Sequence, residues 1–250
     1  MTAWRGIVTA LGLLVLWQLI VTLTGVPSFI LPGPVSVLTT LVARADLLAQ
    51  NALITLVEIL AGIALGTLVG MVSAVVLAAF GPARRWLLPL LVVSQALPVF
   101  ALAPLLVLWL GYGMASKVAM AVLIIFFPVT AAFYDGLRRT QPGWIELART
   151  MDARPWAVLL RIRMPAALPA LASGLRVAAA VAPIGAVIGE WVGSSAGLGF
   201  LMLHANARMQ TDLMFAALFV LALLSLALWF AVDAGLRRLV PWQPDSHAFA

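Results

Sequence analysis

Residues 146–165 read Glu-Leu-Ala-Arg-Thr-Met-Asp-Ala-Arg-Pro-Trp-Ala-Val-Leu-Leu-Arg-Ile-Arg-Met-Pro and interrupt a chain that is otherwise strongly hydrophobic. Four arginines fall within this stretch, at positions 149, 154, 161 and 163. A charged side chain is costly inside the hydrocarbon of a bilayer. We therefore expect the stretch to be a loop on the cytoplasmic side of a membrane, with hydrophobic spans before and after it.

Two short helices are predicted in and just before this loop. The first begins at Pro142, because proline suits the first helical position, where its missing N–H is not needed. Ala148 and Met151 then lie on one apolar face. Asp152 ends this helix, since aspartate tolerates turn conformations, and Pro155 opens the second. An apolar face on a basic loop predicts a partner protein.

The composition predicts an all-α integral membrane protein. Hydrophobic residues make up 64% of the 250 residues, charged residues only 10%, and the mean hydropathy is +1.12. A soluble domain carries roughly 25% charged residues. The length accommodates about six transmembrane helices of ~20 residues in a single domain, residues 1–250, with no soluble domain. The predicted spans are 6–24, 52–80, 86–109, 117–134, 166–190 and 213–235, with the polar loop at 135–165.

Basic residues are distributed unevenly across the predicted topology. Of the fifteen Lys and Arg residues, eleven fall on the side of the polar loop, and Arg176 falls within the fifth span. Only Arg44, Lys117 and Arg208 fall on the outer side. This bias is the positive-inside pattern, and it predicts that both termini are cytoplasmic. For Arg176 we expect a cavity, a carboxylate or the inner interface as its surroundings, with snorkelling to the interface favoured.

The loop resembles the Glu-Ala-Ala loop of the membrane-spanning subunits of binding-protein-dependent ABC importers. That motif reads Glu-Ala-Ala, three residues, Gly, nine residues, Ile, one residue, Leu-Pro, and every spacing is kept here. Three residue types depart from it: Leu147 replaces Ala, Asp152 replaces Gly and Met164 replaces Leu. The flanking hydrophobic segments also follow the family's order, so the resemblance covers most of the chain.

The resemblance implies the type I permease fold of ABC importers and a non-catalytic transport subunit. It implies a homodimer in the bacterial cytoplasmic membrane, two ATP-binding subunits that hold ATP and Mg, and an extracytoplasmic substrate-binding protein. In the family this loop is the coupling helix that docks on the ATPase. The residues expected to dock are Glu146, Leu147, Ala148, Arg149, Met151, Asp152, Trp156, Ile162 and Pro165. For Asp152, a role in ending the helix is favoured over a docking contact.

Within the family the chain looks most similar to the nitrate, sulfonate and taurine subfamily and its relatives for thiamine-precursor pyrimidines. The segments at 103–113 and 189–199 favour the pyrimidine group. A bare sulfonate or nitrate would favour cationic or N–H-rich walls. The candidate pathway instead offers carboxylates, an amide, a proline and an aromatic ring, at Glu58, Gln95, Pro98, Glu190 and Trp191. Glu58 could equally be a paired carboxylate, and Gln95 could equally bond a neighbouring helix.

Three glycines, Gly62, Gly66 and Gly70, recur at four-residue spacing in the second predicted span. Small residues at this spacing let another helix approach closely. Packing inside one subunit is the favoured interpretation, and a dimer seam is the alternative. Residues 190–212 are rich in glycine and serine and contain a short amphipathic piece at 198–206. This region resembles the segment that in the family lines or closes the outer end of the pathway.

Two other classes of function are alternatives. A secondary transporter or channel could use Glu58, Arg176 and Glu190 as coupling charges, but no internal inverted repeat is visible. A membrane-embedded enzyme would need a convergent nucleophile or metal set. The sequence has no cysteine, no Walker A motif, and only two histidines, His204 and His247. The basic residues cluster at predicted membrane edges, so nucleic acid is not an expected partner.

Overall fold

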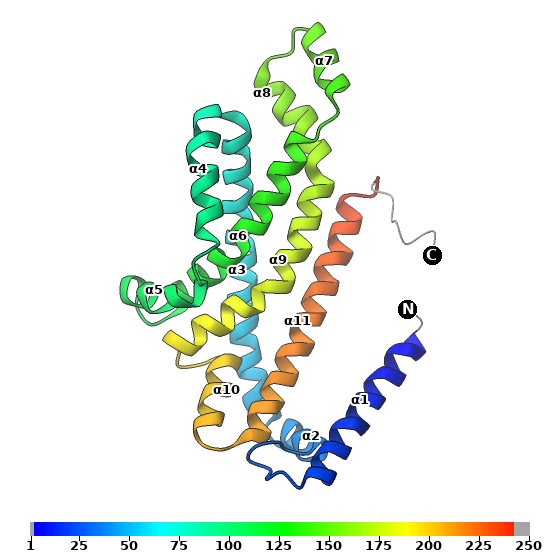
Figure 1. The fold of residues 1–250 in the computed structure, drawn as a ribbon, viewed down its shortest axis with the longest axis vertical. Coiled ribbons are helices and arrows are strands. Elements are labelled where there is room, and N and C mark those ends of the chain that lie inside the picture. Colours follow the sequence, from blue (N-terminus) through cyan, green and yellow to red (C-terminus); the bar gives the residue numbers. More distant parts are fainter. Residues whose placement is uncertain (1–2, 243–250) are drawn as a thin grey trace.

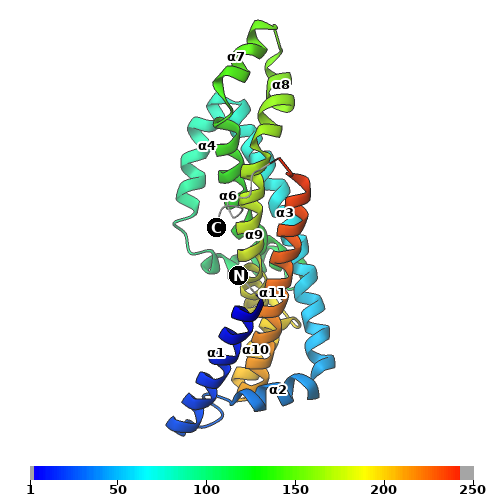
Figure 2. The ribbon, with the colours of Figure 1, turned by 90° about the vertical axis from the view of Figure 1, so that its right-hand side faces the viewer.

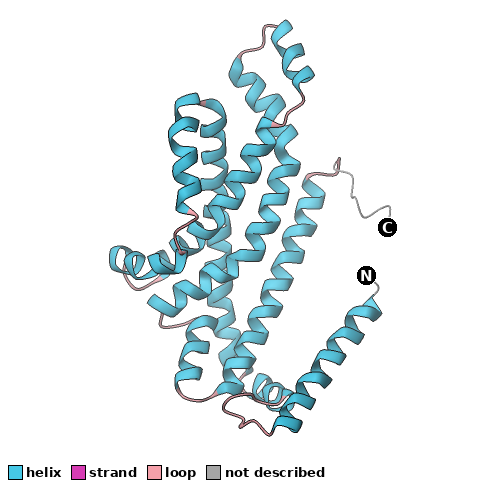
Figure 3. Ribbon diagram, in the orientation of Figure 1, coloured by secondary structure: helices cyan, strands magenta, loops and turns pink. Residues whose placement is uncertain are grey.

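A computed structural model describes residues 3–242, and these residues form helices and loops without a β-strand (Figure 3). Most elements follow the long apolar runs of the sequence. Proline occupies the first or second position of α2, α4, α5, α7, α8 and α9, which fits its fixed φ and missing N–H. The helices are α1 (Ala3–Thr24), α2 (Pro34–Ala43), α3 (Ala45–Ala79), α4 (Gly81–Ser94), η1 (Val99–Leu102), α5 (Ala103–Leu110), α6 (Met114–Arg138), α7 (Pro142–Thr150), α8 (Pro155–Val158), η2 (Leu159–Arg163), α9 (Met164–Gly193), α10 (Leu198–Ala207) and α11 (Thr211–Leu239).

The long helices run along the length of the molecule, between two ends that are built from short helices. Figure 1 shows α7 and α8 at one end and α2 and α10 at the other. Figure 2 shows the same separation after a quarter turn. Helix α6 lies at the centre and packs most extensively against α9 and α3. The main hydrophobic core runs along these three helices and includes Ile125, Val129 and Phe133 of α6, all fully buried.

Small residues on both neighbours allow α6 to be enclosed so tightly. A Cβ added to Gly62 would lie 2.5 Å from the Cβ of Ala121, and one added to Gly66 would lie 2.7 Å from Ile125. A Cβ added to Gly70 would lie 2.8 Å from the Cβ of Val129. The glycine stripe of α3 therefore contacts α6 of its own chain. From the other side, a Cβ on Gly185 would lie 2.7 Å from the Cα of Ala121.

Among the described residues, four helices are long and apolar enough to cross a membrane, namely α3, α6, the continuous helix Pro155–Gly193 and α11. The predicted third span is not one helix. It is the pair Gly81–Ser94 and Val99–Leu110, bent by 94°. Pro98 lies at the break, where proline cannot supply a backbone N–H to continue the helix. The sequence predicts one span over 86–109, whereas the structure turns it by nearly a right angle.

The second helix of the polar loop is continuous with the helix of the fifth predicted span. Helix α8 does not stop near Pro165; it continues through the π-helical segment Leu159–Arg163 into α9. The result is a helix of 39 residues, Pro155–Gly193. A π-helical turn inserts one extra residue without breaking the helix. The second half of the polar loop is thus a rigid extension of the fifth span.

The stretch between the first two predicted spans contains α2 and the first turns of the 35-residue α3. Helix α1 diverges from the bundle along most of its length in Figure 1. Near its end, the ring of Trp17 lies 5.8 Å from that of Phe215 on α11.

Candidate functional site

The loop between α6 and α9 forms a helical hairpin at one tip of the molecule. Helix α7 begins at Pro142, as predicted, and ends at Thr150. Asp152 follows with φ +54, in the left-handed region that glycine adopts most readily. The Ala153 N–H donates to the carbonyl of Ala148 at 3.0 Å and closes the turn. Aspartate tolerates this conformation better than most residues, so the turn forms without the glycine of the motif.

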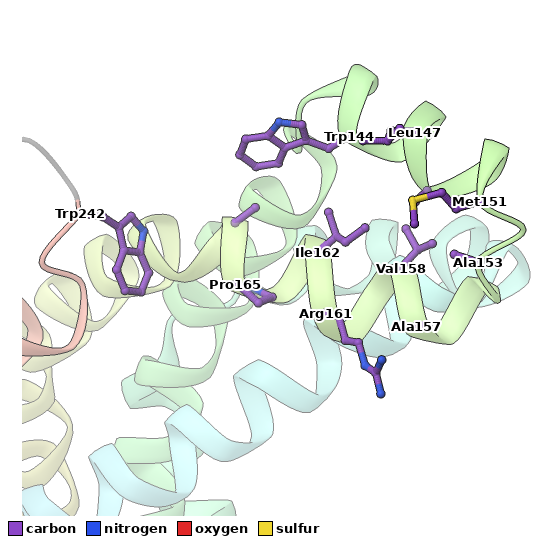
Figure 4. Close-up of a pocket in the computed structure, with 12 residues that line it drawn as sticks. Trp144, Leu147, Met151, Ala153, Ala157, Val158, Arg161, Ile162, Pro165 and Trp242 are labelled. Carbon is purple, nitrogen blue, oxygen red and sulfur yellow. The ribbon is translucent and has the colours of Figure 1, made fainter.

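An apolar pocket lies between α7 and the continuous helix that begins at Pro155. Its volume is about 690 Å³. Figure 4 shows the side chains of α7 on one side and those of α8, η2 and α9 on the other. An exposed apolar surface of this kind marks an interaction site more often than chance would allow. The lining residues are Trp144, Leu147, Ala148, Met151, Ala153, Ala157, Val158, Arg161, Ile162, Pro165, Ala166 and Trp242.

The residues predicted to dock divide into two groups. The apolar ones line the pocket: Leu147, Ala148, Met151, Ile162 and Pro165. The others lie outside it and are exposed: Glu146, Arg149, Asp152 and Trp156. The arrangement is an apolar recess with charged side chains beside it, which is the usual anatomy of a protein interface. Docking itself stays a prediction for each residue.

Two contacts tie this hairpin to other spans. The ring of Trp156 on α8 meets that of Phe80, at the corner between α3 and α4, edge-on with centroids 6.3 Å apart. The guanidinium of Arg163 donates from Nε and Nη2 to the carbonyl of Leu137, at 3.0 and 2.9 Å. Leu137 lies in the last turn of α6, where carbonyls lack partners within the helix. Sequence reasoning missed both contacts, although an arginine opposite a helix end is a recognisable cap.

At the opposite half of the molecule, Glu58 is fully buried and paired with a lysine. The Nζ of Lys117 lies 2.5 Å from Glu58 Oε1 and donates to Ser194 Oγ at 2.9 Å. Lys117 is therefore buried, because its side chain is only 7% exposed and the residue lies in the first turn of α6. A carboxylate on the facing helix supplies the partner that a buried ammonium requires.

Glu190 is buried beside this pair and holds the start of α10. Its carboxylate accepts hydrogen bonds from the hydroxyl of Thr55, at 2.6 Å, and from the backbone N–H groups of Gly199 and Phe200. A negative charge near the first N–H groups of a helix is favourable. Gly197 has φ +116, and a Cβ there would collide with the Glu190 carboxylate. The sequence Gly197-Leu198-Gly199 thus makes room for the carboxylate of Glu190.

The remaining predicted residues are distributed as follows. Gln95 and Pro98 are exposed at the break after α4, and Trp191 is about half exposed near the end of α9. A role of these residues, or of Glu58 and Glu190, in the pathway stays a prediction. Arg176 Nε lies 2.6 Å from Asp233 on α11, so a carboxylate is its partner, one of the three surroundings expected from the sequence.

No group of three or more metal-ligating side chains occurs within residues 3–242. His204 lies in α10, exposed and stacked on Phe200, and His247 lies outside the described residues.

Comparison with known proteins identifies the fold and the family. Residues 66–243 match the model of the binding-protein-dependent transport system inner membrane component. A probable ABC transporter permease protein of Haemophilus influenzae is 58% identical, over 91% of this chain and 93% of that protein. The riboflavin transport system permease of Chloroflexus aurantiacus is 41% identical, over 94% of this chain and 89% of that protein. The formylaminopyrimidine transport permease of Halalkalibacterium halodurans is 37% identical, over 93% of each chain. The taurine transport permease of Escherichia coli is 30% identical, covering 93% and 87%.

Among solved structures, the MetNI methionine ABC transporter in inward-facing conformations superposes with a TM-score of 0.69. The match covers 78% of this chain and 97% of the other, at 19% identity. This likeness confirms the type I permease fold expected from the sequence. The relatives are transport permeases, so the comparisons favour the importer over an ion-coupled transporter or channel.

Proposed function

The chain belongs to the family of binding-protein-dependent transport system inner membrane components, and on this premise we propose how it is coupled to ATP and what it carries. It is a multi-pass permease subunit of an ABC importer. In the proposed complex, two copies line the translocation pathway in the inner membrane, with both termini cytoplasmic. Two partner subunits bind ATP and Mg and hydrolyse the nucleotide. An extracytoplasmic binding protein delivers the solute.

The hairpin of α7 and α8, which we call the coupling hairpin, carries this proposal. It is a protruding element with large exposed apolar side chains, Leu147 at 62% and Met151 at 74% exposed, beside the charged Glu146 and Arg149. Burying each such side chain against a partner stabilises the complex by roughly 1.5–3 kcal/mol. The charged side chains fix the orientation of the partner. The ATPase subunit is the partner that the family provides.

The proposed mechanism uses the hairpin as a rigid lever. ATP closes the paired ATPases and displaces α7 and α8. Helix α8 moves together with α9 because Pro155–Gly193 is one helix. The Arg163 contact passes the displacement to α6, and the Trp156 contact passes it to the corner of α3 and α4. The cavity then changes between inward and outward access, a two-state equilibrium biased by nucleotide.

For the solute, we propose a small nitrogen heterocycle of the thiamine-precursor pyrimidine type. Two relatives whose names specify heterocycles, formylaminopyrimidine and riboflavin, are 37% and 41% identical, whereas the taurine permease is 30% identical. Two exposed candidate pathway residues support the same preference, because Gln95 supplies an amide and Trp191 an aromatic ring. The carboxylates of Glu58 and Glu190 are buried and already have partners within the chain. A nitrate-, sulfonate- or taurine-like solute is the alternative.

Uptake by the reconstituted complex is the test of this proposal. In proteoliposomes that contain the permease, its ATPase and its binding protein, we expect ATP-dependent uptake of a labelled formylaminopyrimidine. Excess unlabelled aminopyrimidine should reduce that uptake at least tenfold, while equal concentrations of taurine or nitrate should leave it unchanged. Competition by taurine or nitrate without any effect of aminopyrimidines would overturn the assignment of the solute. Uptake driven by an ion gradient without the ATPase would overturn the importer mechanism itself.

A further inference from the structure

Two arginines lie at the end of the molecule opposite to the coupling hairpin, where the positive-inside bias disfavours cations. The sequence predicts three basic residues on that side. Lys117 is buried against Glu58, so Arg44 and Arg208 are the two that remain exposed. They are 164 positions apart in sequence: Arg44 joins α2 to α3, and Arg208 follows α10. Both nevertheless line the same pocket.

This pocket, which we call the outer basic pocket, has a volume of about 300 Å³. Its floor is apolar and includes Leu47, Leu201 and Leu213. The rim carries the exposed side chains of Arg44, His204, Arg208 and Gln210. Within the described part of the chain, neither arginine side chain has a hydrogen bond or ion pair.

The outer basic pocket is held on a rigid support. Helix α10, which supplies one wall, is fixed at its start by the buried carboxylate of Glu190. After its end, Met209 adopts φ +57 and leaves its side chain 68% exposed between Arg208 and Gln210. A left-handed backbone is strained at a residue other than glycine, and such strain is concentrated at functional positions. The fold thus presents an apolar tip between two polar rim residues.

We propose that the outer basic pocket is the docking point for an acidic side chain of the extracytoplasmic binding protein. An apolar floor inside a polar, cationic rim matches the anatomy of a protein interface. A small free anion would instead need a site that encloses most of its surface, and here the cations are exposed at the rim. The inference rests on the proposed function, because it needs a binding protein and an outer face opposite to the ATPases.

Complementary charge at such a rim acts mainly on the rate of association and on its salt dependence. The test measures binding of the purified binding protein to the complete permease–ATPase complex in nanodiscs of phosphatidylcholine alone. We expect Arg44→Glu with Arg208→Glu to lower the association rate by about tenfold at low salt and to flatten its salt dependence. ATPase activity without binding protein should be unchanged, which shows that the variant complex is assembled.

A matched control is Asn206→Asp, which adds negative charge to an exposed position of α10 that does not line the pocket. We expect this variant to bind at nearly the wild-type rate. An unchanged association rate in the double variant, or an equal loss in the control, would overturn the proposed docking point. A loss that appears only in nanodiscs with anionic lipid, and not in phosphatidylcholine, would overturn it in favour of a lipid headgroup site. Failure of the wild-type complex to bind any binding protein would contradict the proposed function instead.

Discussion

A Lys117→Met chain is expected to lose about 3–5 kcal/mol of stability, because the substitution leaves the fully buried Glu58 without its ion-pair partner. The two side chains join α6 to α3 in the interior of the membrane domain. The loss should be reversed largely by a second substitution, Glu58→Met. Replacing both members of a buried ion pair by apolar residues of similar size is often neutral or stabilising. Ser194, which also accepts from Lys117, keeps its hydrogen bonds to Ala196 in the double variant.

The measurement is thermal unfolding of the purified chain in detergent, followed by tryptophan fluorescence and by the fraction that remains monodisperse. Arg238→Met is the matched control, since it removes one exposed positive charge from α11. It should unfold within a degree or two of wild type. A Lys117→Met chain as stable as wild type would contradict the buried pair. A double variant as unstable as the single one would show that Lys117 acts through something other than Glu58.

A Gly185→Ala chain is expected to fold poorly, because the added Cβ would lie 2.7 Å from the backbone Cα of Ala121. A flexible side chain could move aside, but a backbone atom of α6 cannot do so without separating the two helices. Overpacking of a close-packed interior typically costs about 1–3 kcal/mol, and occasionally more. The same α6 residue is contacted from the other side by Gly62, so α6 has no space into which it can shift.

Gly235→Ala is the matched control for this substitution. Gly235 lies in α11, and a Cβ there would meet nothing within 4 Å. Alanine favours a helix interior over glycine by up to ~1 kcal/mol, so this variant should be as stable as wild type or more so. The yield of monodisperse protein from membranes and the unfolding temperature measure both variants. Equal behaviour of the two alanine variants would contradict the close contact of α6 and α9.

The coupling hairpin was the part of the fold that the sequence predicted best, because its signals are local. Pro142 sets the start of α7, and Asp152 adopts the turn conformation that ends it. These signals depend on backbone chemistry within a few residues. The continuation of α8 into α9 was missed, because a π-helical segment has no strong sequence signature and Pro165 suggested a boundary.

The partners of the buried charges could not be predicted, because they come from distant parts of the chain. Glu58 and Lys117 are 59 positions apart, and Thr55 and Glu190 are 135 apart. Hydropathy places each of these residues in or near a span but does not orient it toward a particular neighbour. For the same reason the burial of Lys117 could not be predicted. The orientation that the positive-inside count predicts, with both termini cytoplasmic, stays a prediction.

Docking of an ATP-binding subunit on the coupling hairpin is the central claim, and a pull-down of the tagged chain from its native membrane in mild detergent tests it most directly. We predict a stoichiometric ATP-binding subunit with the wild-type chain and its loss when Glu146→Lys and Arg149→Glu are combined. The matched control, Asp135→Lys with Arg139→Glu, exchanges charges at exposed positions near the end of α6 and should retain the subunit. A wild-type chain that purifies alone, from membranes in which uptake still runs, would contradict the account.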